Sequence, residues 1–217
     1  MTSSRLPGKP LMVIEGKSLL EYHVKRLKRA KKIDQIIVAT TVNDTDDVIE
    51  EFCNTNSVEC FRGSEEDVLS RYYHCAEKYD ADLIIRVTGD CPLIDPLIID
   101  ELITYYQQYG GLDYASLDIS KYPRGFDCEI FSRIVLNEIQ AEAMSPHHRE
   151  HVTNFIYSQP ERYNISILSV NSDYSHLRFC VDVEEDFKLI TEVILHFSNR
   201  SIVVGWKEIV ELVSNEP

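Results

Sequence analysis

Basic side chains are scarce in this 217-residue sequence, where 22 lysines and arginines face 36 aspartates and glutamates. The resulting net charge of −14 argues against a general nucleic-acid-binding protein and against binding to an anionic membrane surface. An anionic ligand would therefore have to be held by a local cluster of basic residues.

Long apolar runs and paired cysteines are also lacking. No apolar run approaches the roughly 20 residues that a membrane-spanning helix needs, and the first ten residues contain no apolar stretch typical of a secretory signal. The six cysteines are scattered without a C-x-x-C pair, which favours reduced, mostly buried thiols over a disulfide framework. We expect a cytoplasmic protein without a membrane or nucleic-acid partner.

Two common phosphate-binding motifs are missing as well. Gly16-Lys17-Ser18 resembles the end of a Walker A loop, but Leu11 stands where that motif requires its first glycine. No G-x-G-x-x-G follows an apolar strand, so dinucleotide binding has no support. The stretch 15–17 is interpreted as a turn that leads into a helix.

The sequence does contain a regular alternation of apolar strands and amphipathic helices. Strands are predicted at 36–41, 57–61 and 82–88, and helices at 19–30, 46–55, 63–80 and 96–109. This alternation predicts an α/β fold with a mostly parallel sheet flanked by helices.

The rhythm changes after Gly110-Gly111. Further β segments are predicted at 113–118, 128–131, 164–170 and 178–182, with a helical stretch at 133–158. We interpret residues 1–217 as a single domain in which about 111–175 form an insertion or arm, and Asp182 lies where the chain returns to the sheet.

The loop SSRLPGKP at residues 3–10 is the first candidate site. Gly8 permits close approach of the backbone to a ligand, while Arg5 offers a planar fork and Lys9 a compact charge. Together they suit a polyphosphate. A solvated basic loop is the alternative.

Two aspartates at predicted strand ends form the second candidate site. Asp90 follows an apolar strand in TGDCPLIDP, and Asp182 ends a strand in RFCVDVEEDF. Open α/β sheets bind ligands at this edge, and Mg²⁺ takes one or two protein carboxylates. A helix-capping turn is the alternative for Asp90, and residues 184–186 are expected to complement a helix dipole.

Two further segments carry charged or titratable residues. In PHHREH (146–151), His147 and His151 lie four residues apart, but no third zinc ligand is evident nearby and the HExxH pattern is absent. We therefore expect Arg149 and His151 to face an anionic substrate instead. KYPRGFD carries Arg124 and Asp127 on a glycine-containing loop, which is otherwise a simple hairpin turn.

Six segments, in order, resemble the cytidylyltransferases of the spore coat polysaccharide biosynthesis protein SpsF type, within the wider group of CMP-Kdo and CMP-sialic acid synthetases. They are SSRLPGKPL, RGSEEDVLSRYY, RVTGDCPLIDP, YPRGFDCEIFSR, HREHVTNFIY and SHLRFCVDVEEDF. The resemblance runs from about residue 1 to 190. It implies a nucleotide-diphospho-sugar-transferase-like fold that transfers CMP from CTP to a sugar or sugar acid.

The resemblance also implies roles for individual residues. Ser4, Arg5 and Lys9 match the triphosphate-binding loop, to which Ser3 and Gly8 also belong.

Asp90 and Asp182 match the two metal-binding aspartates, with Mg²⁺ as the expected cofactor. The segments expected to line the sugar pocket contribute Arg86, Arg124, Asp127, Arg149 and His151.

Other outcomes stay open at this point. The chain could use another nucleotide or a sugar 1-phosphate, or it could be an inactive nucleotide- or sugar-binding homologue. Members of the resembled family carry an apolar strand before the loop, whereas this chain begins at Met1, so the first strand is expected to be missing. A truncated gene model is the favoured explanation. A homodimer paired through 111–175 is expected.

Overall fold

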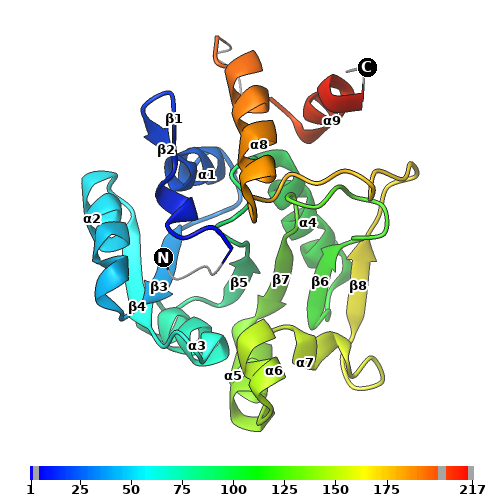
Figure 1. The fold of residues 1–217 in the computed structure, drawn as a ribbon. Coiled ribbons are helices and arrows are strands. Elements are labelled where there is room, and N and C mark those ends of the chain that lie inside the picture. Colours follow the sequence, from blue (N-terminus) through cyan, green and yellow to red (C-terminus); the bar gives the residue numbers. More distant parts are fainter. Residues whose placement is uncertain (2–4, 200–203, 215–217) are drawn as a thin grey trace.

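The computed structural model describes residue 1, residues 5–199 and residues 204–214, and it has an α/β architecture (Figure 1). The strands are β1 (Val13–Ile14), β2 (Lys17–Ser18), β3 (Ile37–Thr41), β4 (Glu59–Gly63), β5 (Leu83–Arg86), β6 (Tyr114–Leu117), β7 (Glu129–Ser132) and β8 (Ile165–Leu168). The helices are α1 (Leu19–Leu27), α2 (Asp47–Thr55), α3 (Val68–Lys78), α4 (Pro96–Tyr109), α5 (Arg133–Glu142), α6 (Pro146–His151), α7 (Asn154–Tyr157), α8 (Glu184–His196) and α9 (Trp206–Ser214), with 3-10 turns η1 (Lys9–Leu11) and η2 (Asp44–Asp46).

The strands fall into separate sheets within the described residues. β1 and β2 form a short antiparallel pair, and β3 pairs with β4 in parallel. The third sheet has the order β5-β7-β6-β8, in which β7 runs antiparallel to both β5 and β6 while β6 and β8 are parallel. The α/β fold is confirmed, but the expected mostly parallel sheet is a mixed one, because the chain loops back between β6 and β7 without a helical crossover.

Residues 111–175 contribute β6, β7 and β8 to the same sheet as β5. The segment predicted as an added arm therefore supplies part of the central sheet, together with α5, α6 and α7. Before β3, the described residues hold the two-residue strands β1 and β2.

The predicted strand at 178–182 is wrong. Its backbone groups bond to loops: Phe179 N–H donates to Arg124 O at 2.7 Å, and Val181 N–H donates to Asp90 O at 2.8 Å. Only an isolated parallel bridge joins Arg124 to Arg178. These loop contacts, rather than a sheet ladder, hold the segment that carries Asp182.

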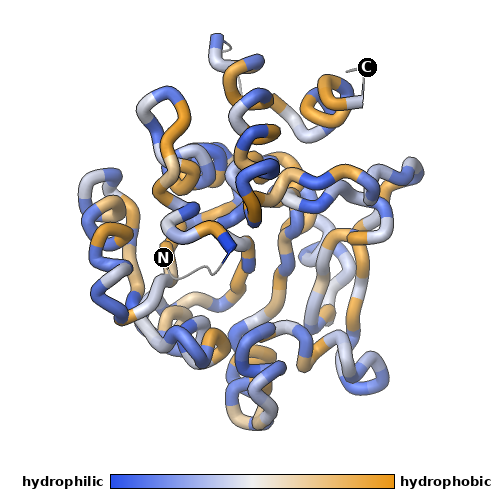
Figure 2. The backbone as a smooth tube through the Cα atoms, in the orientation of Figure 1, coloured by the Kyte–Doolittle hydropathy of each residue, from blue (hydrophilic) through white to orange (hydrophobic). Residues whose placement is uncertain are grey.

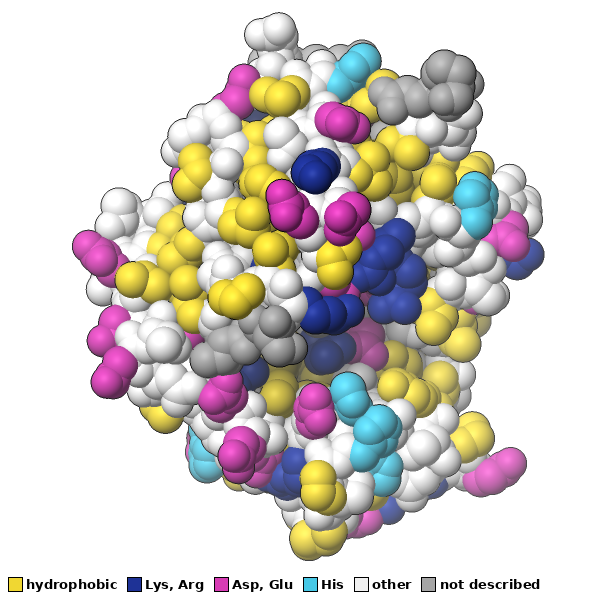
Figure 3. All heavy atoms as spheres, viewed as in Figure 1, with side chains coloured by type: hydrophobic (Ala, Val, Ile, Leu, Met, Phe, Trp, Pro, Cys, Tyr) yellow, Lys and Arg dark blue, Asp and Glu magenta, His cyan; other side chains and the backbone are white. Residues whose placement is uncertain are grey.

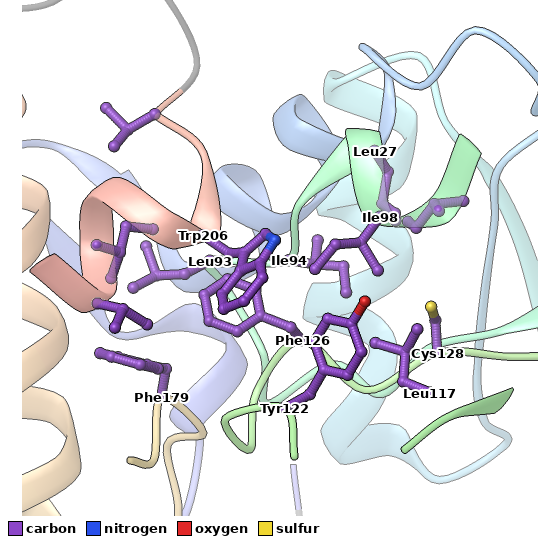
Figure 4. Close-up of a cluster of buried hydrophobic side chains, with 14 of the residues drawn as sticks. Leu27, Leu93, Ile94, Ile98, Leu117, Tyr122, Phe126, Cys128, Phe179 and Trp206 are labelled. Carbon is purple, nitrogen blue, oxygen red and sulfur yellow. The ribbon is translucent and has the colours of Figure 1, made fainter. Parts of the chain in front are cut away.

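The main hydrophobic core contains side chains from β6 and β7 and from helices α1, α4, α8 and α9. Figure 4 shows its aromatic centre, where Phe126 packs near Phe179 and Trp206 with ring centroids 5.5 and 6.4 Å apart. Both phenylalanines are fully buried, which stabilises the fold by about 2–3 kcal/mol each. On the outer helices α2 and α8, hydrophilic and hydrophobic segments alternate along the turns (Figure 2).

Two smaller clusters complete the interior. One packs α3 and α5 against β7 around Leu69, Phe131 and Leu136. The other joins α1 to α2 through Leu20, Val24, Ile49 and Cys53. The loop before β1 spans two clusters, since Leu6 and Met12 pack on the main core and Leu11 on the α1–α2 cluster.

Candidate active site

The N-terminal loop is shaped by Gly8, whose φ of 72° places it in the left-handed region that favours glycine. Leu11 N–H donates to Gly8 O at 2.9 Å, which closes the 3-10 turn η1, and Pro10 stiffens its start. This turn projects the side chain of Lys9 toward the segment before α8.

The ammonium group of Lys9 lies between the two aspartates predicted from the sequence. Nζ donates to Asp182 Oδ1 at 3.0 Å and lies 3.6 Å from Asp90 Oδ2. It also donates to the carbonyl oxygen of Val181 at 2.8 Å. The structure therefore brings together three predicted residues that stand up to 173 positions apart.

Two arginines add to the positive charge around Asp182. Arg5 Nη2 lies 3.1 Å from Oδ1, and Arg178 Nη2 hydrogen-bonds to Oδ2. Burial acts to raise the pKa of Asp182, but hydrogen bonds from Lys9 and Arg178 and the charge of Arg5 outweigh it, so this pKa is lowered. Asp182 is therefore held as a carboxylate. Arg178 was missed from the sequence, although it stands four residues before Asp182.

Asp182 is positioned by the start of α8. Asp186 Oδ2 accepts hydrogen bonds from the backbone N–H groups of Asp182 (2.7 Å) and Val183 (3.1 Å), which caps the helix. Asp90 is fixed from the other side, because its carbonyl accepts the 2.8 Å bond from Val181. The two carboxylates thus belong to loops tied directly to each other.

The turn after β5 is held by the start of α4. Cys91 N–H donates to Thr88 O at 3.2 Å and Ile94 N–H donates to Cys91 O at 3.2 Å. Asp95 then caps α4 by accepting from Leu97 N–H at 2.9 Å. Asp90 therefore sits in a rigid turn with its side chain a quarter exposed.

The donor set fits a divalent cation. The carboxylates of Asp90 and Asp182 both lie close to the ammonium group of Lys9, so a positive charge already stands between them. Oxygen ligands of this kind suit Mg²⁺, which needs only one or two protein carboxylates. Asp90 and Asp182 would hold the ion once Lys9 shifts toward a bound anion.

The charged residues gather around a hollow on one face of the molecule. Figure 3 shows lysine and arginine side chains at the centre of this face, acidic side chains among them, and histidines of α6 on the opposite side of the hollow. Of the predicted triphosphate loop, Ser3 and Ser4 lie outside the described residues.

Arg86 lies at the end of β5 and pairs with Glu129 on β7. Glu129 Oε1 also accepts hydrogen bonds from the hydroxyls of Tyr114 (2.6 Å) and Thr153 (2.7 Å). The pKa of Tyr114 is raised, mainly by burial and further by the charge of Glu129. Glu129 was not predicted as a site residue. The one feature of the sequence that could have indicated it is its charge within the otherwise apolar segment 128–131.

Arg124 and Asp127 lie together on the loop before β7. Arg124 Nε lies 3.2 Å from Asp127 Oδ2, which also accepts from Gly125 N–H at 2.9 Å. The backbone of Arg124 bonds to Leu177 and Phe179 in the segment that leads to Asp182. This loop therefore borders the acidic pair.

Arg149 forms a bidentate ion pair with Asp67, at 3.0 Å from Nε to Oδ1 and 2.6 Å from Nη2 to Oδ2. Its Nη1 donates to the carbonyls of Gln140 and Ala143. The structure thus places Arg149 at the junction of α6 and α3, apart from the acidic pair. His151 packs edge-on against His147, with ring centroids 4.5 Å apart. Substrate binding by either residue stays a prediction.

A separate hollow of about 620 Å³ lies between α1, α2 and the β3–β4 pair. Its lining includes the carboxylates of Asp34, Glu50 and Glu59 and shares no residue with the Lys9 site. The carboxylates on its walls would repel a triphosphate.

Comparison with known proteins identifies the family. A family model described as Cytidylyltransferase matches residues 1–195. The chain belongs to this cytidylyltransferase family. An uncharacterized protein of Methanocaldococcus jannaschii is 36% identical over 99% of this chain and 87% of the relative. The spore coat polysaccharide biosynthesis protein SpsF of Bacillus subtilis is 31% identical over 100% of this chain and 92% of the relative.

Solved structures agree with this assignment. A cytidylyltransferase from Leptospira borgpetersenii superimposes with a TM-score of 0.93 at 30% identity, covering 99% of this chain and 90% of that one. A CMP-2-keto-3-deoxy-manno-octonic acid synthetase complexed with CTP has a TM-score of 0.69 at 19% identity, covering 89% and 94%, which shows a common fold. The predicted family, α/β fold and nucleotidyltransferase class are confirmed. Among the described residues, none of the helices combines the length and hydrophobicity required to cross a bilayer.

Proposed function

We propose that this cytidylyltransferase transfers CMP from CTP to a hydroxyl group of a sugar or sugar acid and releases pyrophosphate. The observation that carries the proposal is the position of Lys9, whose ammonium group lies within reach of both Asp90 and Asp182 at the edge of an arginine-lined hollow. Cations beside a pair of carboxylates match the two needs of nucleotidyl transfer, which are to hold a triphosphate and a divalent ion.

The chain's own residues supply charge and position. Arg5, Lys9 and Arg178 attract the triphosphate and stabilise the negative charge that grows on the departing pyrophosphate. The acceptor hydroxyl forms a bond to the α-phosphorus as the bond to pyrophosphate breaks, and the hydroxyl proton passes to solvent. Mg²⁺, when bound, supplies a Lewis acid that lowers the pKa of that hydroxyl.

Lys9 provides a reason for ordered assembly of the site. In the absence of nucleotide its ammonium group neutralises Asp90 and Asp182. When phosphates arrive, the same group can turn to them and leave the carboxylates free for a metal ion. Nucleotide and metal are therefore expected to bind cooperatively.

The acceptor sugar is assigned to the side of the hollow lined by β5, β7 and α7. Arg86, Tyr114 and Thr153 surround Glu129 there, and such a polar cluster can exchange internal hydrogen bonds for sugar hydroxyls. The relatives also include 8-amino-3,8-dideoxy-manno-octulosonate cytidylyltransferases, one of which is 35% identical over half of this chain. They support a sugar acid as acceptor, and the SpsF relative supports a role in surface polysaccharide synthesis.

Arg124, Asp127, Arg149 and His151 are proposed to contribute to acceptor binding at the rim. Because Arg149 already pairs with Asp67, its contribution would be made through the position of α6.

We further propose a homodimer in the cytoplasm. All six cysteines lie in the described part of the chain and are free thiols, which fits a reducing compartment. Exposed Ile134 and Met144 lie within the segment 111–175 and would be covered by a second subunit. Light scattering during gel filtration measures the mass, and a monomer at all concentrations would contradict the dimer.

Pyrophosphate release tests the main proposal. The protein is supplied with Mg²⁺, each of the four ribonucleoside triphosphates in turn, and a panel of keto-deoxy sugar acids and neutral sugars. We expect release with CTP only, dependent on an acceptor, and lost in Asp90→Ala. Preference for another nucleotide would support the alternative transferase, and nucleotide binding without release by any acceptor would support an inactive homologue.

A further inference from the structure

Two buried cysteines and an aspartate converge beside the acidic pair. Cys91 and Cys180 place their sulfur atoms 3.7 Å apart, and with a carboxylate oxygen of Asp127 these ligand atoms all lie within 4.8 Å of one another. Each cysteine lies beside one member of the acidic pair. Cys91 comes directly after Asp90, and Cys180 stands two residues before Asp182. The nucleotidyl transfer chemistry uses none of the three groups as a metal ligand.

We propose that Cys91, Cys180 and Asp127 form a binding site for a thiophilic divalent cation such as Zn²⁺, separate from the carboxylate pair proposed for Mg²⁺. Two Zn–S bonds of about 2.3 Å at a tetrahedral angle place the sulfurs about 3.8 Å apart. The observed separation of 3.7 Å therefore needs almost no movement. A disulfide, by contrast, needs sulfurs about 2.05 Å apart and would pull the two loops together.

The ligands are oriented as metal sites require. Asp127 Oδ2 accepts hydrogen bonds from Gly125 N–H and Arg124 Nε, which fixes the carboxylate. Thr88 Oγ1 lies within hydrogen-bond distance of Cys91 Sγ, at 3.4 Å. These contacts hold the side chains of Cys91 and Asp127 in place and leave lone pairs on their ligand atoms for a metal ion.

Charge and access also suit a cation. Binding of a divalent ion would displace both thiol protons to solvent, which leaves the ion, two sulfurs and one carboxylate with a net charge of −1. Arg124 and Arg178 interact electrostatically with Cys180 and offset that remainder. Both cysteines are buried, whereas the side chain of Asp127 is 27% exposed, so the ion enters and takes a fourth, water ligand from that side.

Soft ligands distinguish this site from the neighbouring one. Thiolates select Zn²⁺ or Cd²⁺ over Mg²⁺, which prefers oxygen. Bound Zn²⁺ would tie the turn of Asp90 to the segment of Asp182 at a point where Cys91 Sγ is 3.4 Å from Asp90 Oδ1. The ion would therefore act on the geometry of the proposed active site.

Cadmium titration of the reduced full-length protein in excess Mg²⁺ tests the site. We expect a thiolate-to-cadmium charge-transfer band that saturates at one ion per chain and is displaced by Zn²⁺. Cys91→Ser and Cys180→Ser should abolish the band. Asp127→Asn, which changes a partly exposed side chain, should weaken Cd²⁺ binding by about tenfold or more. Circular dichroism checks that each variant is folded.

Matched controls come from the other cysteines. Cys75→Ser removes a buried thiol on α3, and Cys53→Ser removes one on α2, so both should keep the full band. The proposal is overturned if the wild-type protein gives no band, if Mg²⁺ competes with Cd²⁺, or if Cys53→Ser rather than Cys91→Ser abolishes the band. Because the readout is metal binding, it is independent of whether the chain transfers CMP.

Discussion

The ammonium group of Lys9 donates a hydrogen bond of 3.0 Å to Asp182, which stands 173 residues further along the chain. The same group lies 3.6 Å from Asp90. One side chain therefore links the N-terminal loop to both carboxylates, and its charge is available to whichever anion is nearest.

Replacing Lys9 by alanine should lower CTP-dependent pyrophosphate release by about 100- to 1000-fold, because a cation facing the departing phosphates is lost. The free energy of unfolding should change by much less than the activation free energy to which this loss of rate corresponds. Lys188→Ala is the matched control, since Lys188 lies exposed on α8, 3.9 Å from Glu184. A rate near that of the wild type in Lys9→Ala would refute the assigned role.

Gly125→Ala should lower the free energy of unfolding by at least about 2 kcal/mol. The residue has φ of 104°, and an added Cβ would lie 2.6 Å from the carbonyl carbon of Phe179. Urea unfolding measures the loss. Gly89→Ala should change stability by less than about 0.5 kcal/mol, because no atom lies within 4 Å of its added Cβ. Equal stability of the two variants would contradict the close approach of the Gly125 and Phe179 backbones as the cause of the loss.

Arg149→Ala should lower the free energy of unfolding by about 1–3 kcal/mol, since a partly buried bidentate pair and two carbonyl bonds are lost. Arg162→Ala is the control, because its pairs with Glu138 and Glu142 are more exposed and should be worth less than about 1 kcal/mol. If Arg149→Ala keeps its stability but raises KM for the acceptor, the residue contacts substrate directly.

His23 should make stability depend on pH. Burial lowers its pKa to about 4, with the charge of Asp90 acting in the opposite direction and that of Arg26 in the same one. Between its unfolded pKa of about 6.5 and 4, the unfolded chain binds a proton that the native chain does not, so stability falls as pH falls through this window. The full loss is about 3 kcal/mol.

Urea unfolding at several pH values between 4 and 7.5 measures this contribution. His23→Leu should flatten the dependence in that window, whereas His196→Leu, at an exposed position on α8, should leave it as in the wild type. An unchanged slope in His23→Leu would show that other groups account for the dependence.

Asp90 and Asp182 could be singled out from the sequence because each follows an apolar stretch, and that pattern is local; the structure places both near Lys9. The sequence pattern failed for the connection between β6 and β7 and for residues 178–182. Their backbone partners, such as Asp90 for Val181, are distant in sequence and have no periodic signature. The partner of Arg149 was missed for the same reason, since Asp67 lies 82 residues before it in the sequence.

Charge alone also misled in one respect. Arg5 and Lys9 were predicted as cations for an anionic ligand, yet both contact the carboxylate of Asp182. A strongly acidic chain neutralises its carboxylates with whatever cations are close. The local pattern therefore identifies which residues meet, while the order in which they exchange partners requires the three-dimensional arrangement.

The separation of the β3–β4 pair from the four-stranded sheet has a dynamic consequence. Because β3 and β4 belong to a separate sheet among the described residues, we expect their amides to exchange hydrogen faster than those of β6 and β7. Leu11, two residues after Lys9, packs against the cluster between α1 and α2. Opening of this part of the molecule should therefore shift Lys9 and promote release of the nucleotide's phosphates.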